Sequence, residues 1–250
     1  MVQAVAGGVG GRLAARTRWL AWPAVVALAL ALSGCFGGGG ARKDPLADVQ
    51  WSFANDAVMM EIVSNPGLNQ YDGESHTLLL GVYETADAQA FRDLAADPAA
   101  LASSMATGKV PSTFMQFSRY VVTPGQHSFL ILDRAQNTHV VGLVAGYAQM
   151  SAATAVRQYD IPLVVTSKGW IFKTRTTAPG PLVVRLNFGA LGIINSQTLA
   201  NGPSDADMKQ ARQLEGGGKE IKLNANCNCA GTDACTCAGP DGTALRKLGN

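Results

Sequence analysis

Residues 76–84 read HTLLLGVYE, and this stretch decides the fold because its apolar side chains alternate along the chain. Leu78, Leu80 and Val82 fall on one face of an extended strand, since successive side chains of a strand point to opposite faces. Residues 182–188 read LVVRLNF and alternate in the same way, which is the pattern of a half-buried strand. A period of two therefore predicts β-strands that pack on a core.

Further strands and one helical stretch lie around these two segments. Short apolar or alternating stretches, separated by turn residues, predict more strands at 57–64, 117–123, 127–133, 139–149, 157–166 and 170–174. Apolar residues at helical spacing predict helices at 88–96 and at 98–105, the second of which begins with a proline that a first helical turn accepts. The sequence therefore predicts an all-β domain at 49–199, a β-sandwich with a short helical insertion.

The N-terminus has the composition of a cleaved export signal. Three arginines precede an apolar run at 20–32, and two small residues follow the run. Because the run is shorter than the roughly 20 apolar residues of a membrane-spanning helix, we interpret residues 1–34 as a signal peptide. The sequence Leu32-Ser33-Gly34-Cys35 is similar to the bacterial lipobox, in which the chain is cut before a cysteine that carries lipid. The alternative is an ordinary signal peptide that leaves a free or disulfide-bonded thiol at Cys35.

The residues after Cys35 predict where the lipidated protein resides. In many Gram-negative bacteria an aspartate directly after the lipidated cysteine retains the protein in the inner membrane, and Phe36 stands at that place here. We therefore expect anchoring in the inner leaflet of the outer membrane, with the folded domain facing the periplasm. Residues 35–48 include four consecutive glycines and little apolar surface, which predicts a flexible tether with a reach of about 20 Å.

Charge and composition exclude a nucleic-acid partner and separate the C-terminus from the core. Without residues 1–34 the chain has 17 basic and 18 acidic residues, because the signal contains three of the 20 basic residues and none of the 18 acidic ones. The formal charge of the mature chain is −1, and no basic run remains. Residues 200–250 contain no aromatic side chain, so we predict a low-complexity tail outside the core, with a short helix at about 204–214.

This tail contains two C-x-C pairs, formed by Cys227, Cys229, Cys235 and Cys237. An oxidising periplasm favours disulfides, and a bridge within one C-x-C is the most strained of the three pairings, so cross-pairing is preferred. The alternatives are a Zn²⁺ or Cu(I) site of four thiolates and a reduced tail without structure.

The other polar residues show no catalytic or metal-binding pattern. The three histidines, His76, His127 and His139, each stand near the start of a predicted strand and have no carboxylate or cysteine at ligand spacing, so we interpret them as strand-edge residues. A Gly-x-Ser-x-Gly nucleophile motif is missing from the sequence. We therefore predict no enzymatic activity, no metal, no small-molecule substrate and no cofactor other than the covalent lipid on Cys35.

The order of these segments resembles the TssJ family, the outer-membrane lipoproteins of the bacterial type VI secretion system. The similarity lies in LGVYE at 80–84, in Phe91 and Leu94 of the helical segment, in the Pro124-Gly125 turn and in VVGLVAGY at 140–147. It covers roughly residues 35–162. The family often has tryptophan and arginine soon after the tyrosine motif, whereas this chain has Val156-Arg157, and the stretch from 167 onward includes a tail without a match.

The resemblance implies a transthyretin-like, two-layer β-sandwich without catalytic activity that forms part of the type VI secretion membrane complex. The implied partner is the periplasmic C-terminal region of TssM, which is itself joined to TssL. In the family, the loop between the first two strands contributes to that contact, which here implies Asn65, Leu68, Asn69, Gln70, Tyr71 and Asp72. Leu68 and Tyr71 are expected to be the apolar anchors, and the other four residues to supply hydrogen bonds. The alternative function is a periplasmic ligand- or metal-binding lipoprotein with a sandwich scaffold.

Overall fold

The structure is a computed structural model that describes residues 49–168, 174–223, 227–229, 235–237 and 246–248. Its helices are α2 (Ala88–Ala96), α3 (Pro98–Thr107), α4 (Ala152–Ala155) and α5 (Asp205–Met208). Its strands are β1 (Ala54–Ser64), β2 (Leu78–Thr85), β3 (Phe114–Val122), β4 (His127–Arg134), β5 (Val140–Gly146), β6 (Val156–Asp160), β7 (Leu163–Lys168), β8 (Thr174–Pro179), β9 (Leu182–Phe188), β10 (Ile193–Thr198), β11 (Arg212–Gln213), β12 (Lys219–Lys222), β13 (Cys227–Cys229), β14 (Cys235–Cys237) and β15 (Arg246–Leu248).

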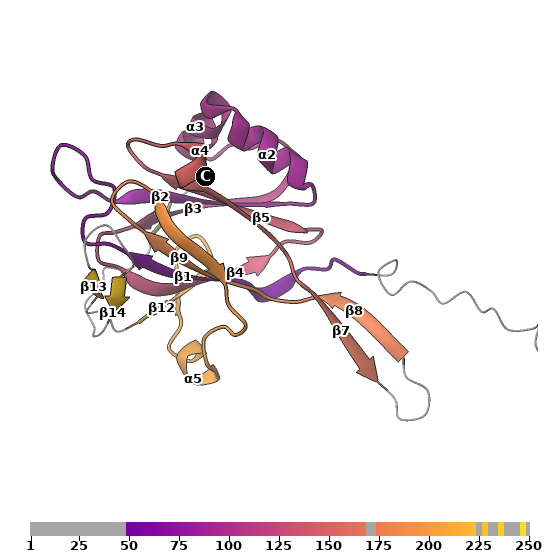
Figure 1. The fold of residues 1–250 in the computed structure, drawn as a ribbon. Helices are drawn as coiled ribbons and strands as arrows, with labels where there is room; N and C mark the ends of the chain where they lie inside the picture. The colour runs from indigo at the N-terminus through magenta and orange to yellow at the C-terminus, as the bar shows by residue number, and fades with distance from the viewer. Residues whose placement is uncertain (1–48, 169–173, 224–226, 230–234, 238–245, 249–250) are drawn as a thin grey trace, which may run out of the picture. The chain divides into compact units, whose positions relative to one another are not determined.

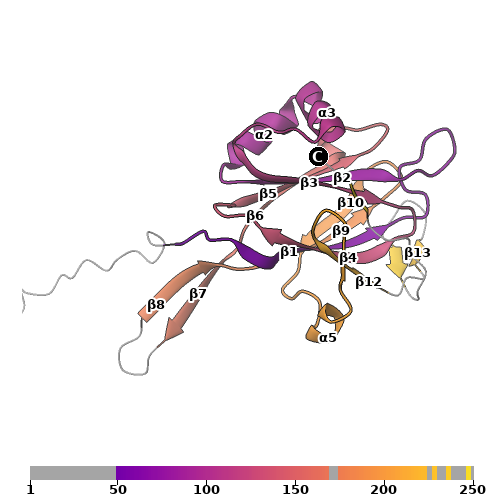
Figure 2. The ribbon, with the colours of Figure 1, turned by 180° about the vertical axis from the view of Figure 1, so that it is seen from behind.

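Two large sheets form the body of the domain. The first has the strand order β10-β9-β1-β4-β12-β11 and the second has β15-β3-β2-β5-β6. Figures 1 and 2 show these sheets stacked as two layers, with α2 and α3 over the outer face of the second sheet. The predicted two-layer β-sandwich with a helical insertion is confirmed.

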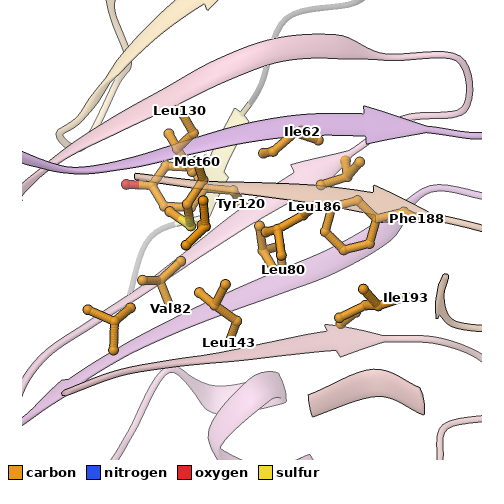
Figure 3. Packing of buried hydrophobic residues seen from close by; sticks show 14 of the residues in the cluster. Met60, Ile62, Leu80, Val82, Tyr120, Leu130, Leu143, Leu186, Phe188 and Ile193 are labelled. Carbon is orange, nitrogen blue, oxygen red and sulfur yellow. The ribbon is translucent and has the colours of Figure 1, made fainter. Parts of the chain in front are cut away.

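The main core lies between the two sheets (Figure 3). It is built from the inward faces of β1, β4 and β9 on one side and of β2, β3 and β5 on the other, since alternate residues of each strand face inward. The labelled members of this cluster are Met60, Ile62, Leu80, Val82, Tyr120, Leu130, Leu143, Leu186, Phe188 and Ile193.

A second cluster lies under the two helices. Asp87 and Asp97 cap α2 and α3 by accepting backbone N–H groups of the first turns. Phe91 of α2 packs directly on Gly142 of β5, where a Cβ atom would clash with the ring. Because the helices cover the outer face of this sheet, β2 is buried on both faces except at Leu79, which is only partly buried.

The prediction that the chain after residue 199 lies outside the core is wrong for the part up to residue 223. β12 pairs with β4 in the first sheet, with β11 as the edge strand beyond it, and Ile221 is buried against Phe129, Ile131 and Val183. Partly buried apolar residues between 199 and 223 complete this third cluster on the outer face of the sheet. The composition of residues 200–223 did not predict this packing, because only a few well-spaced apolar residues are needed to cover one face of a sheet.

The half-buried pattern predicted for 182–188 is wrong for the same reason. Only the central residue of β9, Arg185, is partly exposed, because the segment after residue 199 covers the outer face of its sheet.

Two predicted strands have different limits in the structure. The predicted strand at 157–166 is two strands, β6 and β7, because Pro162 lies between them and has no N–H to donate to a sheet. The predicted strand at 170–174 lies almost wholly outside the described residues, and β8 begins at Thr174. The sequence analysis did not predict β10, because its residues IINSQT are mostly polar and exposed.

The strand register defines two opposite ends of the sandwich. Ser64 at the end of β1 lies beside Phe188 at the end of β9, and we call this the loop end, with the loops at 65–77 and 189–192. The opposite end, which we call the hairpin end, holds the first described residues, the turn after β4 and the β7–β8 hairpin. β1 has 11 residues and spans about 35 Å between these ends.

Candidate partner-binding surface

The loop between β1 and β2 is fixed at its base by a buried leucine. Leu68 is 0% exposed and belongs to the core between the sheets. Its N–H donates to the carbonyl of Asn65 at 2.9 Å, and its own carbonyl accepts the N–H of His76 at 2.9 Å. The base of this loop is therefore part of the folded core.

Two buried asparagines hold the loop in its conformation. The Oδ1 atom of Asn65 accepts the N–H of Gly67 at 2.7 Å. Asn69 donates from Nδ2 to the carbonyl of Thr77 at 2.9 Å and accepts the N–H of Ala148 at 2.8 Å, which ties the loop to the chain after β5. Asn69 also has a φ of 48°, a left-handed conformation that asparagine tolerates better than most residues.

The tip of the loop is a tight turn that displays Tyr71. Tyr71 and Glu74 exchange two backbone hydrogen bonds of 3.0 Å, and the residues between them, Asp72 and Gly73, have φ values of 51° and 82°. Positive φ at both central positions is typical of the type I′ turn that Asp-Gly favours. The ring of His76 lies beside that of Tyr71, with centroids 6.4 Å apart. The side chain of Tyr71 is 50% exposed on this turn, whose backbone conformation is fixed by the two hydrogen bonds.

A second loop lies against the first. The N–H of Gln70 donates to the carbonyl of Ala190, between β9 and β10, at 2.9 Å. This second loop exposes Leu191, at 60%, and Ile194 is exposed, at 38%, at the start of β10. A groove of about 270 Å³ is formed by Thr154 together with residues 189–194. The sequence reading missed this loop, although a leucine between the glycines of Gly189-Ala190-Leu191-Gly192 was a signal for it.

The structure divides the six residues that the sequence assigned to partner binding. Gln70, Tyr71 and Asp72 are exposed at the tip, whereas Asn65, Leu68 and Asn69 are buried in the base. The expectation that Leu68 presents an apolar anchor is wrong, because its side chain fills space between the sheets.

The large apolar side chains that the described residues expose lie only at the two ends of the sandwich. At the loop end they are Tyr71, Leu191 and Ile194. At the hairpin end they are Phe53, Met115, Leu163, Val164 and Val165. Exposed apolar groups that gather on a protein surface often mark places of interaction, so the two ends are the candidate contact surfaces.

A buried ionic cluster lies on the outer face of the first sheet. Glu61 contacts Nε2 of His127 at 2.9 Å and accepts a hydrogen bond from Nε of Arg185 at 2.8 Å. Burial raises the pKa of the Glu61 carboxyl, but the hydrogen bonds and charges of the two partners outweigh it and hold this pKa below its ordinary value. His127 is the first residue of β4, as the sequence predicted, but the prediction missed its partner Glu61, which comes from the neighbouring strand β1.

Several predicted features concern residues whose side chains the structure does not describe. Cys35 lies outside the described residues, as do all of residues 1–48. For the tail cysteines only the backbone register is described, with Cys227 opposite Cys237 and Cys229 opposite Cys235. Within the described residues no group of three or more His, Cys, Asp or Glu side chains is placed to hold a metal ion. None of the described helices combines the length and hydropathy of a bilayer span.

Comparison with known proteins gives a family match and similar structures. A family model described as type VI secretion lipoprotein, VasD, EvfM, TssJ, matches residues 56–171. The structure of the type VI secretion lipoprotein TssJ1 from Pseudomonas aeruginosa is 22% identical, covers 60% of this chain and 98% of its own, and has a TM-score of 0.43. Serratia marcescens Lip, described as a membrane-bound component of the type VI secretion system, is 16% identical over 60% of this chain and 99% of its own, with a TM-score of 0.43.

A structure of the TssM C-terminal domain from EAEC is 14% identical over 58% of this chain and 98% of its own, with a TM-score of 0.36. A search of curated protein sequences gave no match.

Proposed function

Since this chain belongs, through residues 56–171, to the TssJ family of type VI secretion lipoproteins, we propose that it connects the outer membrane to the periplasmic C-terminal region of TssM. The protein acts as a structural component of the secretion membrane complex and catalyses no reaction. Its contact with TssL is indirect, through TssM.

The membrane attachment in this proposal is the lipid on Cys35. The lipobox-like sequence at 32–35 supports lipidation, and Phe36 in place of an aspartate supports the outer membrane. Two or three acyl chains on one residue give stable anchoring, whereas a single chain holds only marginally. The sandwich begins at the hairpin end, so the tether of residues 35–48 joins it there.

The TssM contact in this proposal is the loop end, with Tyr71, Leu191 and Ile194 as its apolar anchors. The main support for this assignment is that Tyr71 is exposed on a turn of fixed conformation. Buried Leu68 and the hydrogen bonds of Asn69 and Ala190 hold this turn in place. A tyrosine held in place loses little conformational freedom on binding, which is why such residues often dominate an interface. The loop end lies about 35 Å from the hairpin end, so one molecule reaches both partners.

The test measures binding of the purified periplasmic C-terminal region of TssM to the full chain with Cys35→Ser, which removes the lipid. Tyr71→Ala should raise the Kd at least about tenfold, as expected for an interface anchor. Met115→Ala is the matched control, because Met115 is similarly exposed, at 42%, but lies at the hairpin end. An unchanged Kd for Tyr71→Ala, or an equal loss for Met115→Ala, would contradict the assignment of the loop end.

A further inference from the structure

The β7–β8 hairpin is a two-stranded ribbon that pairs with neither of the large sheets. Its register runs from Leu163 opposite Pro179 to Lys168 opposite Thr174, and the hydroxyls of Thr166 and Thr176 lie 2.8 Å apart across the strands. A two-stranded ribbon is only marginally stable by itself in water. The hairpin therefore gains stability from any surface that covers it.

This hairpin exposes apolar side chains on both of its faces. Leu163, Val164 and Val165 are 40%, 46% and 57% exposed. Because successive residues of a strand point to opposite faces, the three side chains cannot share one side of the ribbon. A surface that surrounds the ribbon, rather than one that packs on a single face, suits this arrangement.

The hairpin is also basic and contains no acidic residue. The chain has no Asp or Glu between Asp160 and Asp205, whereas β7 ends with Lys168 and β8 contains Arg175. Exposed apolar residues combined with lysine and arginine are typical of segments that bind the interface of an anionic bilayer.

The base of the hairpin lies beside the point where the described chain begins. The buried guanidinium of Arg134 donates to the carbonyl of Ser52 at 2.9 Å and to that of Gly180 at 3.5 Å. The N–H of Gly180 donates to the carbonyl of Pro162 at 2.7 Å and closes the hairpin. The hairpin and the attachment of the tether are thus at the same end of the sandwich.

We propose that the β7–β8 hairpin is a second membrane contact, which places Leu163, Val164 and Val165 in the interface of an anionic phospholipid bilayer. Arg175, which is exposed on β8, contacts the lipid phosphates. This inference rests on the proposed function, because the lipid on Cys35 brings the hairpin end to the membrane. A second contact limits the rotation of the sandwich on its tether and directs the loop end away from the bilayer.

The test uses the full chain with Cys35→Ser, so that covalent lipid does not contribute. Cosedimentation is measured with vesicles of phosphatidylethanolamine and phosphatidylglycerol, and with neutral phosphatidylcholine vesicles. The protein should bind the anionic vesicles more strongly, and added salt should weaken that binding. Val165→Glu and Arg175→Glu should each lower the partition coefficient at least about tenfold, since each places a negative charge in the contact. Leu191→Glu is the matched control at the loop end, with a side chain that is 60% exposed, and should bind normally.

Three results would overturn the membrane contact. These are no binding of the Cys35→Ser protein to anionic vesicles, equal binding by the Val165→Glu and Leu191→Glu variants, and self-association that Val165→Glu abolishes without any vesicle binding. The last result would identify the hairpin as a strand-pairing surface. Circular dichroism establishes that each variant is folded. Neither TssM nor the lipid on Cys35 is present in the assay, so its failure is distinguishable from failure of the proposed function.

Discussion

Gln70 donates its backbone N–H to the carbonyl of Ala190 at 2.9 Å, and this bond joins two loops that are far apart in the sequence. Tyr71 follows Gln70 directly and Leu191 follows Ala190, so the bond places the two most exposed apolar side chains of the loop end on adjoining loops. The two loops therefore form one surface, and a partner that binds one of them meets the other.

This connection predicts that Tyr71 and Leu191 act together in TssM binding. Tyr71→Ala should weaken binding by at least about 1.4 kcal/mol, and Leu191→Ala should weaken it by about 1 to 2 kcal/mol. The loss of binding free energy in the double variant should differ from the sum of the two single losses by at least about 0.5 kcal/mol, as is usual for neighbouring interface residues. Calorimetric titration of the four proteins gives this coupling, and strict additivity would show that the two loops bind independently.

Leu68 and Tyr71 should behave differently although they belong to the same loop. Leu68→Ala removes a fully buried side chain and should lower the free energy of unfolding by about 2 to 5 kcal/mol. Tyr71→Ala should change it by less than about 0.5 kcal/mol, because its side chain faces solvent. Urea denaturation of both variants measures the difference. A similar stability for the two would mean that Leu68 does not support the core.

The sequence predicted the fold well where apolar residues are dense and regular. β2, β4 and the helical insertion were found because their patterns repeat over several residues. β12 was missed because KEIK offers a single apolar residue, and Ile221 is buried only because Phe129, Ile131 and Val183 come together on one sheet face. Contacts between distant segments have no signal in one local window.

The position of the loop at 65–77 was predicted, but the direction of its side chains was not. The sequence placed the loop correctly between the first two strands, yet it could not tell Leu68, which turns inward, from Tyr71, which turns outward. Both are apolar residues among turn formers, and only the space left between the sheets distinguishes them. The pairing of His127 with Glu61 was hidden for a related reason, since the register of two strands creates it.

Glu61 should make stability depend on pH in the acid range. Its pKa is lower in the folded protein than the ordinary 4.5 of the unfolded chain. The ionised carboxylate therefore contributes fully to the free energy of unfolding above about pH 4.5, and this contribution is lost as the pH falls through the pKa of the folded protein. Glu61→Gln should lower the free energy of unfolding by about 1 to 2 kcal/mol at pH 7. The effect is modest because Arg185 is partly exposed, so solvent screens its charge.

The relevant measurement is the difference in unfolding free energy between wild type and Glu61→Gln from pH 7 to pH 3. The difference is needed because burial raises the pKa of Glu84, whose own contribution changes with pH in the opposite direction. The gap between the two proteins should shrink below about pH 4.5. A gap that stays constant or widens on acidification would rule out the charged Glu61 as its source.

The register of β13 and β14 predicts one of the three disulfide pairings. Residues directly opposite on antiparallel strands have Cα atoms about 4.5 to 5.5 Å apart, within the range that a disulfide spans, whereas diagonal neighbours lie about 7 to 8 Å apart. Cys227 should therefore bond to Cys237, and Cys229 to Cys235. Each bond forms by exchange with an oxidised protein disulfide, which accepts the two electrons.

Mass spectrometry of the non-reduced protein, cleaved before Asp233 and fragmented, identifies the linked cysteines. Four free thiols, stoichiometric zinc or copper, or a bond between Cys227 and Cys229 would contradict this pairing.

In the proposed function, lipid anchors one end of the protein while the other end binds TssM. This arrangement is tested by the fraction of an exported TssM periplasmic region that sediments with outer membranes after a high-salt wash. Wild type should retain this region on the membrane. Cys35→Ser should reduce the retained fraction to the level of cells without the protein, although this variant still binds the region in solution, and Tyr71→Ala should lower the retained fraction below that of wild type. Retention by Cys35→Ser equal to that of wild type would contradict anchoring through the lipid on Cys35.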